Sequence, residues 1–274
     1  MKASEKLVES VWRRCEGHFL NNTSSNRSHS WEQADKSSLY ALNEYFQGSS
    51  YRFSLLINLA KKYLPPNAKV LDAGAGHGVL AIALKDSNFH AEASDLHKGL
   101  AIFDAEQVPY HTWHLEAENA PFADNSFDAV ILSQTIEHFT YSPLQPLKEI
   151  VRILRPGGIM IIDAPNISCF RNASRILRGK SIHWDLKKHY LEQVPEIANH
   201  IPYYDRHNHE YSYEDLLAIA EFFNLEIEEI AYYSSCNRQK RGWLAIFAAR
   251  IRDSIKHWRK GIYAVYRLPN SMKQ

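Results

Sequence analysis

Short apolar runs of strand length alternate with segments of helical apolar spacing through the middle of the chain, from residue 65 to residue 165. The alternation predicts a parallel sheet with helices on both faces. Right-handed crossovers then place a ligand at the carboxyl ends of the strands. The predicted strands are KVLDA, FHAEASD, TWHLEA, FDAVILS and GIMIIDAP, and the predicted helices are GVLAIALKD and PLQPLKEIVRIL.

The segments before and after this region also have apolar and polar patterns that predict secondary structure. Residues 1–50 are polar and irregular and predict an N-terminal helical arm, and residues 51–64 have the apolar spacing of a helix that ends before two prolines. Further on, YEDLLAIAEFF predicts a helix with Ser212 as its N-cap. EIEEIAYYSS predicts a strand, and WLAIFAARI predicts an antiparallel last strand. The fold class is therefore α/β, with a doubly wound and mostly parallel sheet.

The last part of the chain combines apolar periodicity with positive charge. From residue 238 onward, ten Lys and Arg residues stand against one acid, a net charge of +9 in a chain whose total is +1. Within residues 251–265, apolar side chains recur at helical spacing and most basic ones lie off that face, which predicts a basic amphipathic helix. Three interpretations stay open: the helix packs on its own domain, docks on an anionic membrane, or contacts RNA. No nucleic-acid partner is expected, because no basic-aromatic module accompanies the helix.

These patterns divide the chain into three parts. Residues 1–50 form the arm, residues 51–250 the α/β domain, and residues 251–274 the basic amphipathic tail. An insertion at residues 167–210, rich in Arg, His, Trp and Tyr, follows the predicted strand GIMIIDAP. We expect this insertion to form a lid, because it starts at the ligand end of the sheet.

Composition narrows the class of protein. Hydrophobic residues make up 45% of the 274 residues, as in a soluble globular protein. The first residues break their apolar positions with charges, unlike a signal peptide, and no apolar stretch reaches the roughly 18 residues of a membrane span. Three cysteines, Cys15, Cys169 and Cys236, lie far apart without zinc-ligand spacing. We therefore expect a cytoplasmic protein without a disulfide framework.

The stretch LDAGAGHG places three glycines, Gly74, Gly76 and Gly78, directly after a predicted strand. Glycines in this position allow a ligand or another part of the protein to approach the backbone closely. A dinucleotide-binding loop requires glycine or alanine where this chain has Val79. A nicotinamide-dependent oxidoreductase is therefore a disfavoured alternative, and the sequence also lacks a catalytic Tyr-x-x-x-Lys set.

Four segments in order resemble the motifs of the class I, seven-strand S-adenosyl-L-methionine (SAM)-dependent methyltransferases. They are LDAGAGHG, FHAEASD, LEAENAPFADNSFDAVILSQTIEHF and RILRPGGIMII. The resemblance covers about residues 65–165 and is closest in character to the quinone-biosynthesis and glycan-type small-molecule enzymes. It implies a Rossmann-like sheet of seven strands, with SAM as cofactor and S-adenosyl-L-homocysteine as product.

The resemblance also implies which residues hold SAM. Asp72 would organise the methionine end, while Gly74 and Gly76 let SAM approach the backbone. Asp95, about twenty residues further, would accept both ribose hydroxyls. Glu116 stands where the family usually has Asp and would face the adenine, with Gln134 beside the methionine portion. The complete expected set is Asp72, Gly74, Gly76, Asp95, Leu96, Glu116, Ala117 and Gln134.

Methyl transfer to an O–H or N–H group also requires removal of a proton. His138, in the segment QTIEHF, is a candidate base, and Asn166, after the predicted strand GIMIIDAP, is expected to face the acceptor. His209 is expected either in the acceptor pocket or at the entry of a helix. His207 and His209 form a His-x-His pair that can ligate zinc, but the family segment lacks a metal, so no metal is expected.

Together these observations predict a SAM-dependent methyltransferase. Its acceptor is expected to be a small molecule or a lipid- or sugar-linked group, methylated on a hydroxyl oxygen. Peripheral contact with an anionic membrane through the tail is a further expectation. The alternative within the same fold is a non-catalytic SAM-binding or scaffold protein.

Overall fold

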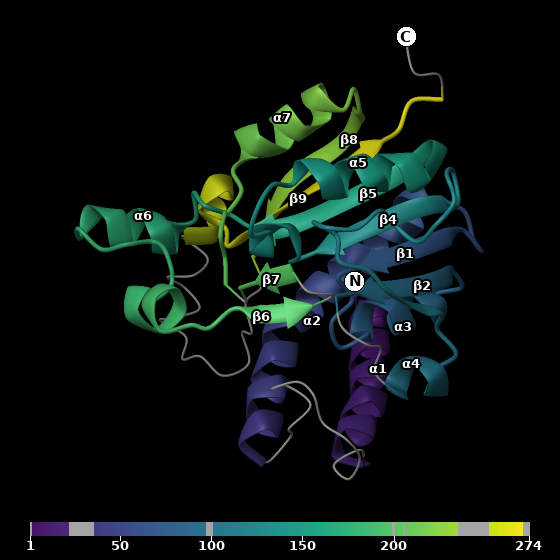
Figure 1. Cartoon of the computed structure of the whole chain (residues 1–274), viewed down its shortest axis with the longest axis horizontal. Coiled ribbons are helices and arrows are strands. Elements are labelled where there is room, and N and C mark those ends of the chain that lie inside the picture. Colours follow the sequence, from purple (N-terminus) through teal and green to yellow (C-terminus); the bar gives the residue numbers. More distant parts are fainter. Residues whose placement is uncertain are drawn as a thin grey trace.

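The computed structural model describes residues 2–21, 36–96, 101–198, 201–204, 206–234 and 252–270. Its centre is a seven-stranded sheet in the order β3-β2-β1-β4-β5-β9-β8 (Figure 1). The first five strands pair in parallel, while β9 is antiparallel to both β5 and β8. The strands of this sheet are β1 (Lys69–Ala73), β2 (His90–Asp95), β3 (Tyr110–Thr112), β4 (Phe127–Ser133), β5 (Leu154–Pro165), β8 (Glu226–Tyr233) and β9 (Gly261–Arg267).

Helices cover both faces of the sheet (Figure 1). Strand side chains alternate between the faces, so Val70 packs with the first four helices and Leu71 packs with α5 and α7. Ser212 caps α7 in a capping box with Asp215, as the sequence predicts. The helices are α1 (Lys2–Asn21), α2 (Lys36–Tyr63), α3 (Val79–Lys85), α4 (Ala101–Ala105), α5 (Leu144–Ile153), α6 (Phe170–Leu177) and α7 (Tyr213–Phe222).

The start of the chain is part of the core and not an arm. Val8, Val11 and Cys15 of α1 are fully buried among side chains of α2 and α3. Trp12 stacks on Phe46 of α2 at 4.6 Å between ring centroids. The expectation of an arm over residues 1–50 is therefore wrong for α1 and for the described part of α2. Residues 22–35 lie outside the described residues.

The expected C-terminal amphipathic helix is wrong for residues 261–267, which form β9. Ile262, Ala264 and Tyr266 are buried on one face of the sheet, while Tyr263 and Val265 are buried on the other. A strand buried on both faces has a nearly continuous apolar run, which also fits helical spacing. Pairing with two neighbouring strands makes this segment a strand and not a helix. The expected last strand, WLAIFAARI, lies outside the described residues.

The predicted strand TWHLEA is displaced along the chain. The sheet uses residues 110–112 as β3, and the chain leaves the sheet at Trp113, which is buried and donates its indole N–H to the Glu118 carbonyl. The other strands of the alternating region lie within a few residues of their expected places.

The insertion at residues 167–210 projects from the carboxyl end of β5 (Figure 1). It starts with α6 and continues through a helical turn, η2 (Lys187–Leu191). A two-stranded hairpin follows, made of β6 (Glu196–Ala198) and β7 (Ile201–Tyr203). Among the described residues, no helix is both long enough and apolar enough to cross a membrane.

Candidate active site

A cavity of about 320 Å³ lies at the carboxyl ends of β1, β2 and β4. The glycine loop after β1 forms one wall, and the segment after β4 forms another. Tyr203 and Tyr204 of the insertion close part of the opening. Seven of the eight residues expected to hold SAM line this cavity: Asp72, Gly74, Gly76, Asp95, Leu96, Glu116 and Gln134. Ala117 is not among its lining residues.

The glycines of the loop serve two different purposes. All three adopt positive φ angles, between +49° and +83°. A Cβ on Gly74 would lie 2.4 Å from the hydroxyl oxygen of Thr135, so this glycine lets the loop pack against the end of β4. A Cβ on Gly76 would meet no atom within 4 Å. Gly76 therefore keeps the cavity open where a ligand approaches the backbone.

Two carboxyl groups stand at the floor of the cavity. Asp95 accepts backbone N–H bonds from Gly76 and Leu96, both at 2.7 Å, which fixes its orientation. Asp72 is buried, and its Oδ2 has no hydrogen-bond partner among the described residues. Burial and the nearby charge of Asp95 raise the pKa of Asp72 to about 7. A positively charged ligand would favour ionised Asp72, because it offsets both effects.

The adenine end of the expected site contains one residue that the sequence analysis missed. Glu116 uses its carboxylate to accept the backbone N–H groups of Thr140 and Tyr141, at 2.9 and 2.7 Å. It therefore joins two loops at the cavity wall. His114, two residues earlier in the chain, is buried, and neither ring nitrogen has a hydrogen-bond partner in the part of the chain that the structure describes. No motif indicates His114, because its place in the cavity depends on how the chain turns after β3.

A second cavity, of about 340 Å³, shares Gln134 with the first. It lies between the end of β5, the insertion and α2. Its lining residues are Gly48, Arg52, Gln134, Pro165, Asn166, Cys169, Arg171, Trp184, His207, Glu210, Tyr233, Lys260 and Gly261. The two cavities are therefore adjacent.

Asn166 and His209 lie differently from what the sequence suggests. Asn166 lines the second cavity, but its amide donates to the carbonyls of His257 and Arg259 and accepts from Ser168 N–H. These bonds fasten the end of β5 to the chain before β9. His209 lines neither cavity; its side chain is 58% exposed and lies 3.7 Å from Asp215. The expected placement of His209 in the acceptor pocket is therefore corrected.

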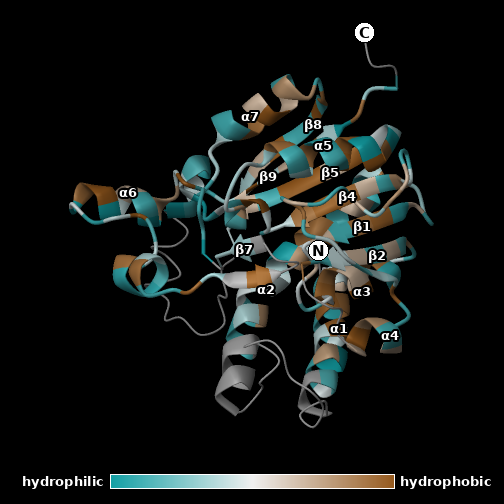
Figure 2. Cartoon of the chain, viewed as in Figure 1, coloured by the Kyte–Doolittle hydropathy of each residue, from teal (hydrophilic) through white to brown (hydrophobic). Residues whose placement is uncertain are grey.

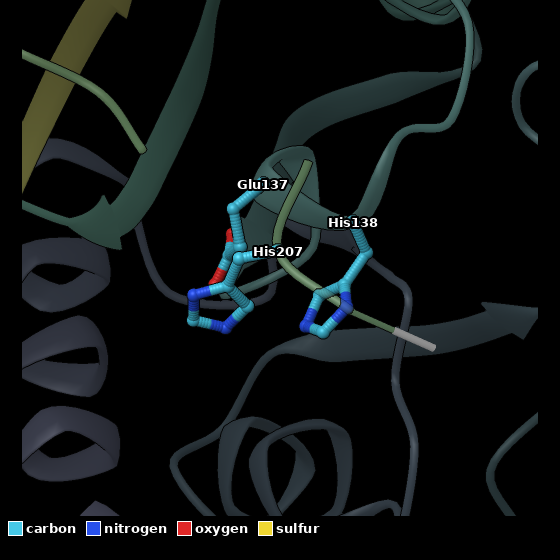
Figure 3. Close-up of side chains that lie close together, drawn as sticks. All are labelled: Glu137, His138 and His207. Carbon is cyan, nitrogen blue, oxygen red and sulfur yellow. The ribbon is translucent and has the colours of Figure 1, made fainter. Parts of the chain in front are cut away.

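His207, two residues earlier, joins Glu137 and His138 where the cavities meet (Figure 3). The ligand atoms of these three side chains all lie within 4.8 Å of one another. Backbone bonds cause the convergence: Glu137 O accepts Asn208 N–H at 2.8 Å, and the Asn208 amide donates to His138 O at 3.1 Å. The segment 207–209 is thereby held against the end of β4.

The chemistry of this group follows from burial. Glu137 is fully buried, and neither carboxyl oxygen has a hydrogen-bond partner within the described ranges of the chain. Burial raises the pKa of Glu137 well above the usual range. The rings of His138 and His207 meet edge to face at 4.9 Å. His207 Nδ1 lies 3.5 Å from Glu210, which orients the ring. Such a group can move a proton, and one carboxylate with two imidazoles can also hold a divalent metal ion.

A buried polar network supports the wall of the second cavity. Asp163 lies 3.6 Å from the Arg52 guanidinium and accepts the Tyr233 hydroxyl at 2.5 Å. Burial raises the pKa of Asp163 to about 6 despite the nearby Arg52. The sequence analysis missed Arg52 and Tyr233, because they come from α2 and β8, far from β5 in sequence.

Comparisons with known proteins agree with this geometry. A sequence model of a family described as "Methyltransferase domain" matches residues 45–230. Demethylmenaquinone methyltransferase of Clavibacter sepedonicus is 33% identical over 98 residues, which are 34% of this chain and 40% of that protein. The Renibacterium salmoninarum protein of the same name is 32% identical over 138 residues, 49% of this chain and 53% of that protein. The chain thus spans about half the length of the curated relatives it matches.

Solved structures share the fold. A SAM-dependent methyltransferase of Methanosarcina mazei has a TM-score of 0.53 and 13% identity, covering 78% of this chain and 98% of that one. One from Archaeoglobus fulgidus has a TM-score of 0.52 and 14% identity, covering 82% and 99%. The family model extends over more than half of the chain, and the strand order places the glycine loop at the carboxyl ends of the parallel strands. The chain therefore belongs to the class I SAM-dependent methyltransferase family.

Proposed function

We propose that the chain transfers a methyl group from SAM to a small-molecule acceptor that binds in the second cavity. The observation that carries this proposal is the meeting of the two cavities at Gln134, beside Glu137, His138 and His207. A donor in the first cavity and an acceptor in the second would face each other at this point. Alignment of this kind supplies much of the rate enhancement in group transfer.

The residues of the first cavity suit SAM. Asp95 is fixed by two backbone bonds in an orientation that suits ribose hydroxyls, and Gly76 leaves the backbone open. The unpartnered Oδ2 of Asp72 suits the positive charge of the methionine portion. His114 has two unpartnered ring nitrogens for the polar edge of the adenine. When bound, SAM supplies an activated methyl group, so the protein needs only to orient the acceptor and remove a proton.

We assign proton removal to the pair His138 and His207. Glu210 lies beside His207 Nδ1, so Nε2 of that ring is the nitrogen available to take a proton. Neutral imidazole accepts the proton of an acceptor hydroxyl as its oxygen is methylated. Burial raises the pKa of Glu137 well above its usual range, which favours the protonated carboxyl. This mechanism requires no metal.

The relatives and the lining of the second cavity suggest a ring-bearing acceptor. The relatives are named for demethylmenaquinone, a quinone. Trp184 and Tyr233 line the cavity and offer flat surfaces to a ring. We therefore propose a ring-bearing acceptor, and the proton acceptor supplied by the imidazole pair is the reason to propose a hydroxyl oxygen as the methylated atom.

Titration calorimetry tests the cofactor part of the proposal. SAM should bind the wild-type protein, and Asp95→Ala should weaken binding by more than about tenfold, because charge-assisted hydrogen bonds contribute roughly 1.5–3 kcal/mol each. Glu214→Ala, in the first turn of α7, is the matched control and should bind SAM as the wild type does. Tight binding of NADH without binding of SAM would overturn the assignment.

Turnover separates an enzyme from a non-catalytic SAM-binding protein. The protein is incubated with a cell extract and SAM that carries an isotopic label on its methyl group. We expect S-adenosyl-L-homocysteine and a labelled ring compound in the mass spectrum. SAM binding without either product would instead support the scaffold alternative.

A further inference from the structure

The insertion carries several large apolar side chains that are mostly exposed. Leu177 at the end of α6 is 88% exposed, Leu191 in η2 is 72% exposed and Val194 is 79% exposed. Monomeric proteins expose single apolar residues widely, but a gathered set marks a binding surface. The exposed large apolar residues from residue 176 to residue 197 are Ile176, Leu177, Leu186, Leu191, Val194 and Ile197. We call this set the apolar rim.

Positive charge surrounds the apolar rim. Residues 170–197, which include the whole apolar rim, contain six Lys and Arg residues and three acids, Asp185, Glu192 and Glu196, a net charge of +3. The whole chain carries +1, so the remaining residues sum to −2. Arg171 and Arg175 on α6 and Arg178, its C-cap, recur at helical spacing on a different side from Leu177, and Arg171 at the start of this face lines the second cavity. Figure 2 shows hydrophobic and hydrophilic residues close together on α6, which stands apart from the sheet.

We infer that the insertion docks on an anionic membrane surface through the apolar rim and the basic residues around it. The combination of protruding aliphatic side chains and adjacent cations matches the two components of a bilayer surface, its acyl boundary and its anionic head groups. We infer that the apolar rim binds a membrane and not an acidic protein, because a charged protein surface would offer no apolar contact to its six large apolar side chains. The expected tail helix does not supply this contact, since residues 261–267 are a buried strand.

The inner side of the same segment lines the second cavity through Arg171 and Trp184. Asn172, between the two surfaces, is buried and donates to Ile167 O and to Glu210, which fastens α6 to the site. A docked membrane would therefore lie beside the acceptor cavity. This consequence rests on the proposed function, and it points to an acceptor that is dissolved in or linked to lipid. The docking itself does not depend on methyl transfer.

Vesicle co-sedimentation tests the docking. The probes are phosphatidylcholine vesicles and the same vesicles with about 30% phosphatidylglycerol, at about 0.05 M and 0.5 M salt. We expect the wild-type protein to bind the anionic vesicles at low salt and at least about tenfold more weakly on neutral lipid or at high salt. Absence of binding to anionic vesicles at low salt would overturn the inference.

Paired variants separate the two components of the surface. Leu177→Ser with Leu191→Ser removes apolar contact, and Arg175→Glu with Lys188→Glu reverses charge; each pair should weaken binding at least about tenfold. The matched controls are Phe222→Ser on α7, where the side chain is 64% exposed, and Lys148→Glu on α5. Both controls should bind vesicles as the wild type does, and all variants should keep the wild-type affinity for SAM.

Two results would contradict the inference even if vesicles bind. Unchanged binding of the Leu177→Ser, Leu191→Ser variant would place the membrane contact elsewhere on the chain. A wild-type dimer by light scattering that this variant converts to a monomer would assign the apolar rim to a second copy of the chain. Either result leaves the proposed methyl transfer standing, because its tests use SAM binding and product formation.

Discussion

At the scale of single residues, the site combines predicted and unpredicted side chains for a physical reason. Asp72, Gly76 and Asp95 belong to short motifs with a recognisable spacing, so these residues can be identified from the sequence alone. His114 has no such motif. The sequence indicates His207 only as half of a His-x-His pair with His209, and its partners Glu137 and His138 come from a segment seventy residues earlier. Contacts across such distances depend on the completed fold.

Asp72 predicts how SAM binding depends on pH. Its pKa of about 7 in the fold exceeds the ordinary value of 3.8. Between these two values the folded protein holds a proton that the unfolded chain has lost, so the free protein loses stability as the pH rises through this window. Positive SAM favours the ionised carboxylate, and its affinity should therefore rise from about pH 6 to about pH 8. Calorimetry should show this rise in the wild type and a flatter profile in Asp72→Asn; equal profiles would contradict the assignment.

His207 and His209 form a matched pair for testing the base. His207→Ala should lower turnover by about 100-fold or more, the usual contribution of a general base, and leave the SAM affinity unchanged. His209→Ala should behave as the wild type, since its side chain lines neither cavity. Equal loss in both variants would show a structural role for the segment.

Dialysis against a chelator tests whether proton transfer depends on a divalent metal ion. We expect full turnover after removal of divalent metal ions, because the two imidazoles alone accept the proton. Loss of turnover that added zinc or manganese restores would instead assign Glu137, His138 and His207 as metal ligands.

At the scale of elements, the sequence predicts what local periodicity decides. The strands β1, β2 and β4 and the helices α5 and α7 lie within about two residues of their expected bounds, because one period dominates each segment. The failure at β9 has the opposite cause. Residues 261–267 are apolar on both faces, and only pairing with β5 and β8 makes them a strand.

The position of β9 predicts a large loss of stability on substitution. Tyr266 is fully buried, and its hydroxyl donates to Leu216 O at 2.7 Å. Tyr266→Ala should destabilise the protein by about 3–5 kcal/mol, as removal of a large buried ring does. Glu228→Ala, on the neighbouring strand, removes only a surface ion pair with Arg267 and should cost less than about 1 kcal/mol. Urea unfolding measures both; equal small effects would favour an exposed tail over a central strand.

At the scale of the whole molecule, the donor cavity draws on distant parts of the chain. Tyr45 and Phe53 reach it from α2, Asp95 from β2 and Tyr203 from the insertion. A ligand that contacts all of these elements binds the folded state alone. At 100 times its dissociation constant, such a ligand adds about 2.7 kcal/mol to the free energy of unfolding.

Saturating SAM should therefore raise the melting temperature by roughly 5–10 °C, since 1 kcal/mol corresponds to about 2–4 °C in a protein of this size. A thermal melt with and without SAM measures the shift. The Asp95→Ala variant, at the same SAM concentration, is the control and should shift less. An equal shift in both proteins would indicate that SAM binds elsewhere.

The place of β9 between β5 and β8 has a consequence for synthesis on the ribosome. Strand β8 is made before β9, and among the described residues it pairs with β9 alone. While residues 261–267 are still inside the exit tunnel, β5 and β8 therefore lack the strand that joins them. Unpaired strand edges invite pairing with other nascent chains. This side of the sheet thus stays open to chaperones until β9 leaves the tunnel and pairs with both strands.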